Sequence, residues 1–381
     1  MTGATTPIEP GELLLHVGLH KTGTTALQVA LADARAELAE HQVRYPGEGT
    51  FQHRAVLAGA GRRYGWQNNG AREVPRKYWD ELVAQSAFDG RTVVSSEFLD
   101  DVDEKTARSM IEDLGGASRV RVVVTLRSIG AILPSAWQQR LKAGYTSPYP
   151  QFLKMVFADE QTPKARKFWF RHDQVAQVQR WAGLVGIGRT YAVIIPDGDR
   201  RAIFTAFEDL LGLPAGMLGD REIAIQNRSM TAQEAEFVRL LNKDVAGDLT
   251  WDEYTRTVRR GLVLSMVEQR RPGADEQRIV TPGWAADKAA DYGRRFADGV
   301  AASGVNVIGD PAELARRPAS GKSKRPKSLS MDAAVAATAG LVRRSTAGGA
   351  SQQPGRAEAL RILLRRRGRG AEAPEGSEPP A

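Results

Sequence analysis

The segment Gly18–Thr25 (GLHKTGTT) lies directly after the apolar run Leu13–Val17 and directly before the helical pattern Ala26–Ala32. A strand, a glycine-rich loop and a helix in this order form an anion-binding site. Glycines let the backbone turn tightly, and the first N–H groups of a helix have no partner within it. Lys21 adds a mobile cation to the loop. We therefore expect this junction to hold a phosphate.

The position of the lysine narrows the kind of phosphate. In the P-loop of nucleoside triphosphatases, two glycines separated by four residues are followed by Lys and then by Ser or Thr. Gly18 and Gly23 keep that separation and Thr25 stands where the magnesium-binding hydroxyl would be, but Thr24 replaces the lysine. A lysine before the second glycine is poorly placed to reach β- and γ-phosphates. The loop is interpreted as a site for one 5′-phosphoryl group, with no obligatory metal.

A second candidate anion site follows the β-branched run Val120–Arg127, which is typical of a buried parallel strand. Arg127 stands at the carboxyl end of this strand. Ser135 follows about two helical turns later, just before the helical stretch 136–143. A guanidinium and a hydroxyl so spaced can converge on one dianion. The alternative is a strand-terminal arginine in a surface salt bridge and a serine at a helix start.

A third predicted strand, Arg91–Leu99, carries the polar residues Ser95, Ser96 and Glu97 near its carboxyl end. In open α/β sheets, ligands gather at the carboxyl edge of the strands. We therefore expect these side chains to face the same crevice as Arg127 and the glycine-rich loop. Glu97 is a chemically adequate base there, and its alternative role is to cap a loop or helix.

The loop and its flanks, residues 16–28 (HVGLHKTGTTALQ), resemble the 5′-phosphosulfate-binding loop of sulfotransferases that use 3′-phosphoadenosine 5′-phosphosulfate (PAPS), particularly of their bacterial branch. The resemblance covers about residues 11–310 and is strongest at the three strand ends. It implies PAPS as the co-substrate and no metal. It also implies two groups of donor-binding residues: His20, Lys21, Thr22, Gly23, Thr24 and Thr25 for the 5′-phosphosulfate, and Arg127 and Ser135 for the 3′-phosphate.

The resemblance further implies the catalytic residues. Some members of the family carry a catalytic histidine at the end of the equivalent strand, and others use a glutamate as the base. This chain has Glu97 there in place of the histidine. Glu97 is then the general base, and Lys21 stabilises the leaving phosphate. Phosphate and sulfate oxygens nearby should raise the pKa of Glu97. His53 follows the Gly-rich stretch 45–52 and resembles a histidine that lies near the active site in bacterial relatives, although a lone loop histidine is more often structural.

The expected acceptor is a hydroxyl or amine of a carbohydrate, lipid or secondary metabolite. Two other readings stay open: a P-loop enzyme of the kinase type that uses ATP, and a non-catalytic nucleotide-binding scaffold. The displaced lysine, and the lack of a clear aspartate of the Walker-B type at a strand end, disfavour the first of these. Five histidines, no cysteine and no HxxxH pair argue against a zinc site.

Apolar strands that alternate with helical stretches predict an α/β fold, a three-layer sandwich around a mainly parallel, P-loop-like sheet. A hydrophobic content of 42% is enough for a sizeable core. A further strand is expected at residues 189–196, followed by helices at residues 201–211, 231–245 and 251–270. Thr231 and Glu234 form a capping-box pattern at the start of the second of these helices.

The chain is divided into a flexible N-terminus (residues 1–10), the α/β domain (11–310) and a basic low-complexity tail (311–381). The tail contains 14 Lys and Arg against 6 Asp and Glu, so its net charge of +8 equals that of the whole chain. Because it is rich in Ala, Gly, Ser, Pro and Arg, it is expected to be disordered or partly helical, with candidate helices at residues 331–339 and 356–367.

The basic tail could contact an anionic membrane surface or another protein, or remain a solvated arm with no partner. It has no interleaved aromatic residues for base stacking, so sequence-specific nucleic-acid binding is not expected. The first residues lack the charged start and long apolar core of a secretory signal, and no apolar window reaches about 20 residues. Together with the lack of cysteine, this indicates a cytoplasmic protein, which agrees with cytosolic synthesis of PAPS.

Overall fold

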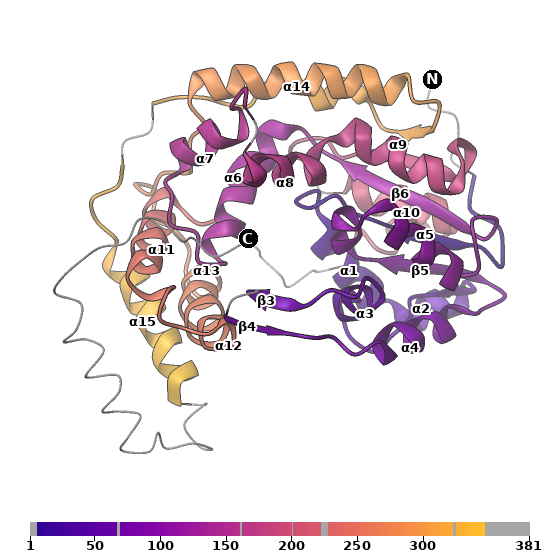
Figure 1. Ribbon diagram of the computed structural model, residues 1–381, viewed down its shortest axis with the longest axis horizontal. Coiled ribbons are helices and arrows are strands. Elements are labelled where there is room, and N and C mark those ends of the chain that lie inside the picture. The colour runs from indigo at the N-terminus through magenta and orange to yellow at the C-terminus, as the bar shows by residue number, and fades with distance from the viewer. Residues whose placement is uncertain are drawn as a thin grey trace.

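The computed structural model describes residues 6–66, 69–160, 162–199, 201–221, 228–322 and 325–346. Its centre is a six-stranded sheet in the order β2-β5-β1-β6-β7-β8, in which every neighbouring pair is parallel (Figure 1). The strands are β1 Leu13–His16, β2 Val43–Arg44, β5 Arg91–Ser95, β6 Val120–Leu126, β7 Thr190–Ile194 and β8 Asn306–Ile308. A separate antiparallel hairpin joins β3 Tyr64–Trp66 to β4 Asn69–Arg72.

Helices connect the strands and cover both faces of the sheet. The α-helices are α1 Thr24–Asp33, α2 Arg35–Glu40, α3 His53–Gly59, α4 Lys77–Ser86, α5 Glu104–Asp113, α6 Ile129–Leu141, α7 Tyr149–Val156, α8 Pro163–His172, α9 Gln174–Val185, α10 Ala202–Leu211, α11 Ala232–Val245, α12 Trp251–Tyr254, α13 Leu264–Glu268, α14 Gly283–Ala301 and α15 Met331–Thr346. The 3-10 helices are η1 Glu97–Asp101, η2 Ile187–Arg189 and η4 Pro311–Ala315, and η3 Thr255–Val263 is a π-helix.

Alternating residues of the strands feed two separate hydrophobic clusters, one on each face of the sheet. In β1, Leu13 and Leu15 pack into the cluster that also holds Trp181 of α9, while Leu14 packs with Phe207 of α10 on the other face. Strands buried on both faces need helices on both sides. The structure is thus a three-layer α/β sandwich, which confirms the fold class predicted from the sequence.

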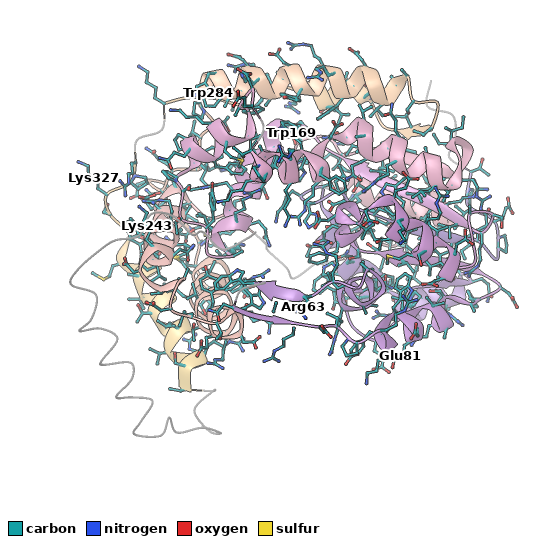
Figure 2. All side chains as sticks on the ribbon, in the orientation of Figure 1. Arg63, Glu81, Trp169, Lys243, Trp284 and Lys327 are labelled. Atoms are coloured by element: carbon teal, nitrogen blue, oxygen red, sulfur yellow. The ribbon has the colours of Figure 1, made fainter. Side chains whose placement is uncertain are left out.

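The helix α14 lies along one side of the molecule, across α6, α8 and α9 (Figure 1). Trp169 of α8 stacks on Tyr292 of α14 with ring centroids 4.3 Å apart, whereas Trp284 at the start of α14 is 41% exposed (Figure 2). The aromatic stack fixes α8 beneath α14. This matters for the site because the last turn of α8 reaches the sheet edge described below.

The predicted strands at 13–17, 120–127 and 189–196 and the helix at 201–211 are confirmed, with ends that differ by at most two residues. The helix expected at 136–143 begins earlier, at Ile129, because the Ser128 side chain accepts from the Ala131 N–H and caps it. Pro134 lies inside this helix. The stretch 251–270 is helical but divides into α12, the π-helix η3 and α13, which end at residue 268.

Part of the segment assigned to the tail lies on the domain. The 3-10 helix η4 packs against α14, and α15 packs against η3 with Ala333, Ala337 and Gly340 buried. Figure 1 shows α15 beside α12 and α13, on the side of the molecule away from the sheet. The candidate helix at 356–367 lies outside the described residues. Among the described helices, none has the length and apolar character needed to cross a membrane.

Candidate functional site

Four neighbouring parallel strands end at one edge of the sheet, in the order β5, β1, β6, β7. The ladder between β1 and β6 continues past the last strand residue, because the Leu19 N–H donates to the Thr125 carbonyl oxygen at 2.9 Å. Lys21 follows β1 and Arg127 follows β6, so both cations lie at the carboxyl edge of the sheet. Glu97 follows β5 at the same edge.

The loop between β1 and α1 has the backbone geometry of an anion site. Gly23 has φ 102° and forms the N-cap of α1, and Lys21 has φ 72°, also in the left-handed region. The first backbone bond of the helix runs from the Ala26 N–H to the Gly23 carbonyl oxygen. The N–H groups of Thr24 and Thr25 precede that bond, so they are available to an anion at the positive end of the helix.

The glycine at the start of this loop allows a close approach between two strand ends. A Cβ at Gly18 would lie 3.1 Å from both Cα and Cβ of Glu97. A larger residue would therefore push the loop away from β5. This contact places Glu97 beside the loop that carries Lys21.

The predicted loop residues differ in what their side chains do. Thr22 is buried, and its hydroxyl donates to the Leu19 carbonyl oxygen at 2.7 Å and shares a hydrogen bond with the Thr125 hydroxyl at 2.6 Å. This side chain holds the loop together from inside. Thr24 is buried at the first position of α1, and Thr25 is half-buried beside it.

Lys21 extends from the loop to α6, where its Nζ donates to Gln139 Oε1 at 3.0 Å. Burial lowers the pKa of Lys21 to about 8, the nearby cations Lys142 and Arg259 add to this effect, and Glu97 opposes it. A cation with a pKa near physiological pH and surrounded by like charge is stabilised by an incoming anion. Arg259 was not among the residues predicted from the sequence.

Glu97 begins the 3-10 helix η1 and is held by neighbours on both sides. Gln28 of α1 donates to its Oε2 at 3.2 Å, and His53 Nε2 of α3 lies 3.6 Å from the same oxygen. Burial by itself raises the pKa of Glu97, but His53, His20 and the hydrogen bond from Gln28 lower it by more. The expected rise concerned the phosphate and sulfate of a bound donor, whereas in the protein by itself two imidazoles beside the carboxylate lower its pKa.

His53 stands at the first position of α3, beside the site. Its Nδ1 shares a hydrogen bond with the Ser96 hydroxyl at 2.9 Å, and its ring stacks on Phe51. Burial lowers the pKa of His53, although Glu97 opposes the shift. The structure therefore brings together the three residues predicted to be catalytic, Lys21, Glu97 and His53, at one edge.

Arg127 lies farther along the edge of the sheet and forms an ion pair within the protein. Its Nε donates to Asp197 Oδ1 at 2.8 Å, and the neighbouring Ser128 hydroxyl donates to Asp197 Oδ2 at 2.8 Å. Asp197 follows β7 and was not predicted to take part. No described residue hydrogen-bonds the terminal guanidinium nitrogens, so these are open to a ligand. Ser135 is half-buried two turns along α6, the helix that Ser128 caps.

Two polar residues at the strand ends serve the core. His16 is fully buried, with Nδ1 2.8 Å from the Ser95 hydroxyl and Nε2 3.2 Å from the Thr125 hydroxyl. Burial lowers the pKa of His16 to about 4, so the ring is neutral at physiological pH. Ser95 is thus an internal partner of His16, not a group that faces the crevice as expected.

The residue that sequence reasoning missed most plainly is Asp100, on η1 after Glu97. Asp100 is fully buried, and its Oδ2 lies 2.5 Å from Nδ1 of His20. The only sequence signal is an aspartate three residues after Glu97, which does not reveal that η1 folds back toward the loop. Among the described residues, no group of three His, Cys, Asp or Glu side chains is placed to hold a metal ion.

Comparison with known proteins gives one structural similarity. No protein-family model matches the chain, and neither does any curated protein. Among solved structures, a sulfotransferase from Alicyclobacillus acidocaldarius is similar at 17% sequence identity and a TM-score of 0.37, over 63% of this chain and 94% of the other.

Proposed function

We propose that this protein transfers a sulfuryl group from PAPS to a hydroxyl or amine, on an acceptor that is a carbohydrate, a lipid or another small molecule. The proposal rests on the loop sequence and on one observation. Lys21 and Arg127 follow neighbouring parallel strands and lie at the same edge of the sheet. PAPS carries an anionic group at each end of its ribose, so it requires two separate cationic sites on one side of the protein.

The residues present fit the donor. The N–H groups at the start of α1 and the Lys21 ammonium suit the 5′-phosphosulfate, and the terminal nitrogens of Arg127 with the Ser135 hydroxyl suit the 3′-phosphate. When bound, PAPS supplies the sulfuryl group and the leaving phosphate. Gln139 holds the Lys21 ammonium at 3.0 Å, which orients the cation for that phosphate.

In this proposal, Glu97 removes the proton from the acceptor oxygen or nitrogen. Its low pKa keeps it ionised and able to accept, while the hydrogen bond from Gln28 and the nearby His53 fix its position. Lys21 neutralises charge that develops on the departing phosphate. We place the reaction in the cytoplasm, where PAPS is made.

Isothermal titration calorimetry tests the proposal and separates it from the alternatives. We expect adenosine 3′,5′-bisphosphate to bind, and ATP with magnesium to bind at least tenfold more weakly. The opposite order would favour the P-loop enzyme of the kinase type. Slow release of labelled sulfate from PAPS by the purified chain would then distinguish an enzyme from a non-catalytic binder.

The role of Arg127 has its own test. A charge-assisted contact is worth about 1.5–3 kcal/mol, so Arg127→Ala should weaken adenosine 3′,5′-bisphosphate about 10- to 100-fold. Binding of adenosine 5′-monophosphate, which lacks the 3′-phosphate, should change by less than threefold. Arg63→Ala is the matched control, because Arg63 is 60% exposed on the surface (Figure 2). Equal loss for both nucleotides would remove Arg127 from the 3′-phosphate site.

A further inference from the structure

His20 and Asp100 form a pair that the proposed reaction has not yet used. Asp100 Oδ2 accepts from the His20 backbone N–H at 3.0 Å and lies 2.5 Å from His20 Nδ1. The Asp100 carbonyl oxygen in turn accepts from Gln177 at 2.8 Å and from Arg180 at 3.0 Å, both on α9. Asp100 is therefore fixed from two sides, and it fixes the imidazole of His20.

Asp100 is buried beside His20. Its side chain is fully buried, and its Oδ1 has no hydrogen-bond partner among the described residues. A buried carboxylate is costly unless it is paired or hydrogen-bonded. Within the described part of the chain, Nδ1 of His20 is the side-chain group that lies against Asp100 Oδ2. The carboxylate therefore holds this ring nitrogen in place.

Other charged groups also lie near the pair. Glu97, also on η1, interacts with His20, and so do His53 of α3 and His172 of α8. Lys21 is the next residue along the loop. Two arginines, Arg171 of α8 and Arg180 of α9, interact with Asp100. Charges of both signs therefore surround the pair.

The second ring nitrogen of His20 remains for a ligand. Nδ1 is taken by Asp100, while no described residue hydrogen-bonds Nε2, and the side chain is 17% exposed. The Phe98 ring packs edge-on against the imidazole, with centroids 5.7 Å apart, and limits its rotation. His20 directly precedes Lys21. Its Nε2 therefore lies on the loop that is proposed to hold the phosphosulfate.

We propose that His20 is the acid of the sulfuryl-transfer step, with Asp100 as its positioning residue, an inference that rests on the proposed function. The acceptor oxygen or nitrogen forms its bond to sulfur while its proton passes to Glu97. The bond between sulfur and the bridging oxygen breaks, and its electron pair stays on the 5′-phosphate. The Nε2 proton of His20 passes to that phosphate. Asp100 holds the imidazole on Nδ1.

Asp100→Asn tests the pair, because the amide keeps the shape of the side chain and removes its charge. The assay is hydrolysis of labelled PAPS by the full chain, which requires the same leaving group and no known acceptor. We expect kcat to fall about 100-fold. The alkaline limb of the pH profile should move at least one unit lower, with the KM for PAPS within threefold. Asp159→Asn, an exposed carboxylate, is the control.

His20→Gln is the second variant that tests the pair. It should lower kcat by about 100-fold or more, and it should bind adenosine 3′,5′-bisphosphate within threefold of the parent chain. In that variant, Asp100→Asn should have no further effect on the pH profile. An unmoved alkaline limb in Asp100→Asn, or more than a tenth of the parent kcat in His20→Gln, would overturn the inference.

Nitrogen-15 NMR of labelled histidines reports on the pair without any turnover. The Nδ1 signal of His20 should shift in Asp100→Asn, because the hydrogen bond to the carboxylate is lost. An unchanged Nδ1 signal would overturn the role given to Asp100. If the parent chain neither binds adenosine 3′,5′-bisphosphate nor hydrolyses PAPS, the proposed function fails and His20 loses its role with it. Binding and hydrolysis with no change in the variants would refute the acid pair alone.

Discussion

At the scale of single residues, the charge of Lys21 is the most sensitive property of the site. Its pKa of about 8 reflects burial first and then the like charges of Lys142 and Arg259. A lysine in water stays charged to a pH above 10. Here the free protein begins to lose the charge only one unit above neutral pH. The site gains from this arrangement because an anion that restores the charge also relieves the repulsion among three cations.

Binding of adenosine 3′,5′-bisphosphate should therefore depend on pH. The anion favours charged Lys21 and raises its pKa in the complex, so above pH 8 the free protein must take up a proton to bind. Affinity should fall by up to tenfold per pH unit above about 8, where the phosphates of the ligand are already fully ionised. Calorimetry across pH 6–10 measures this. An affinity that does not change with pH would show that Lys21 does not contact the phosphate.

Lys142→Gln provides the comparison for that profile. Removing this neighbouring cation should raise the pKa of Lys21, since Lys142 contributes to lowering it. The fall in affinity should then begin at a higher pH than in the parent chain. Lys243→Gln on α11 changes the net charge by the same amount at a residue that plays no part in the site, and it should leave the onset unchanged.

Glu97→Gln should abolish turnover and leave nucleotide affinity nearly intact. The amide keeps the size of the side chain but cannot accept a proton, and loss of a general base costs about 100- to 10,000-fold. The rate of sulfate release and the affinity for adenosine 3′,5′-bisphosphate are measured on the same preparation. A variant with a near-normal rate would show that another group removes the proton.

At the scale of elements, the sequence was sufficient where short-range chemistry decides the structure. The apolar runs and glycines around Gly18–Thr25 predicted β1, the loop and α1, and the pattern of Thr231 with Glu234 predicted the capping box of α11, which the structure confirms. The edge that gathers Lys21, Glu97 and Arg127 followed from the rule for parallel strands.

The partners of these residues could not be predicted, because they come from distant elements. Asp197 follows β7 and reaches Arg127 seventy residues away in the chain. Gln139 and Lys142 face Lys21 because of how α6 packs, and Asp100 meets His20 because of how η1 turns. The two imidazoles that lower the pKa of Glu97 also come from other elements. Periodicity describes which face of an element is buried, not which distant side chain meets it.

The contact between α15 and the π-helix η3 depends on two glycines. A Cβ at Gly340 would overlap the carbonyl oxygen of Gly261 and the hydroxyl of Ser265. Gly340→Ala should therefore lower the free energy of unfolding by about 1–3 kcal/mol, through overpacking of a close helix contact. Denaturation with urea measures the loss. Thr338→Ala, on the exposed face of the same helix, should change stability by less than about 0.5 kcal/mol.

At the scale of the whole molecule, net positive charge is separated from the α/β domain. Residues 1–310 are neutral in sum, and the net charge of +8 belongs to residues 311–381. The structure divides this basic segment, because η4 and α15 pack on the domain while residues from 347 onward lie outside the described part. The arginine-rich stretch 361–369 follows α15. Residues 311–346 carry +6 of this net charge and residues 347–381 carry +2, with five of the six arginines of the latter gathered at 361–369.

We propose that residues 347–381 bind anionic membrane surfaces, since each Lys or Arg near such a surface contributes about 1 kcal/mol. The full chain should sediment with phosphatidylserine vesicles at low salt and dissociate as salt rises, whereas a chain ending at Thr346 should stay in solution. Both should bind adenosine 3′,5′-bisphosphate equally, because the donor site lies at the sheet edge. Vesicles of phosphatidylcholine alone are the control. Equal sedimentation of the two chains would show that the domain, and not residues 347–381, binds the vesicles. If neither chain sediments, the proposal is refuted, and a protein becomes the candidate partner of these residues.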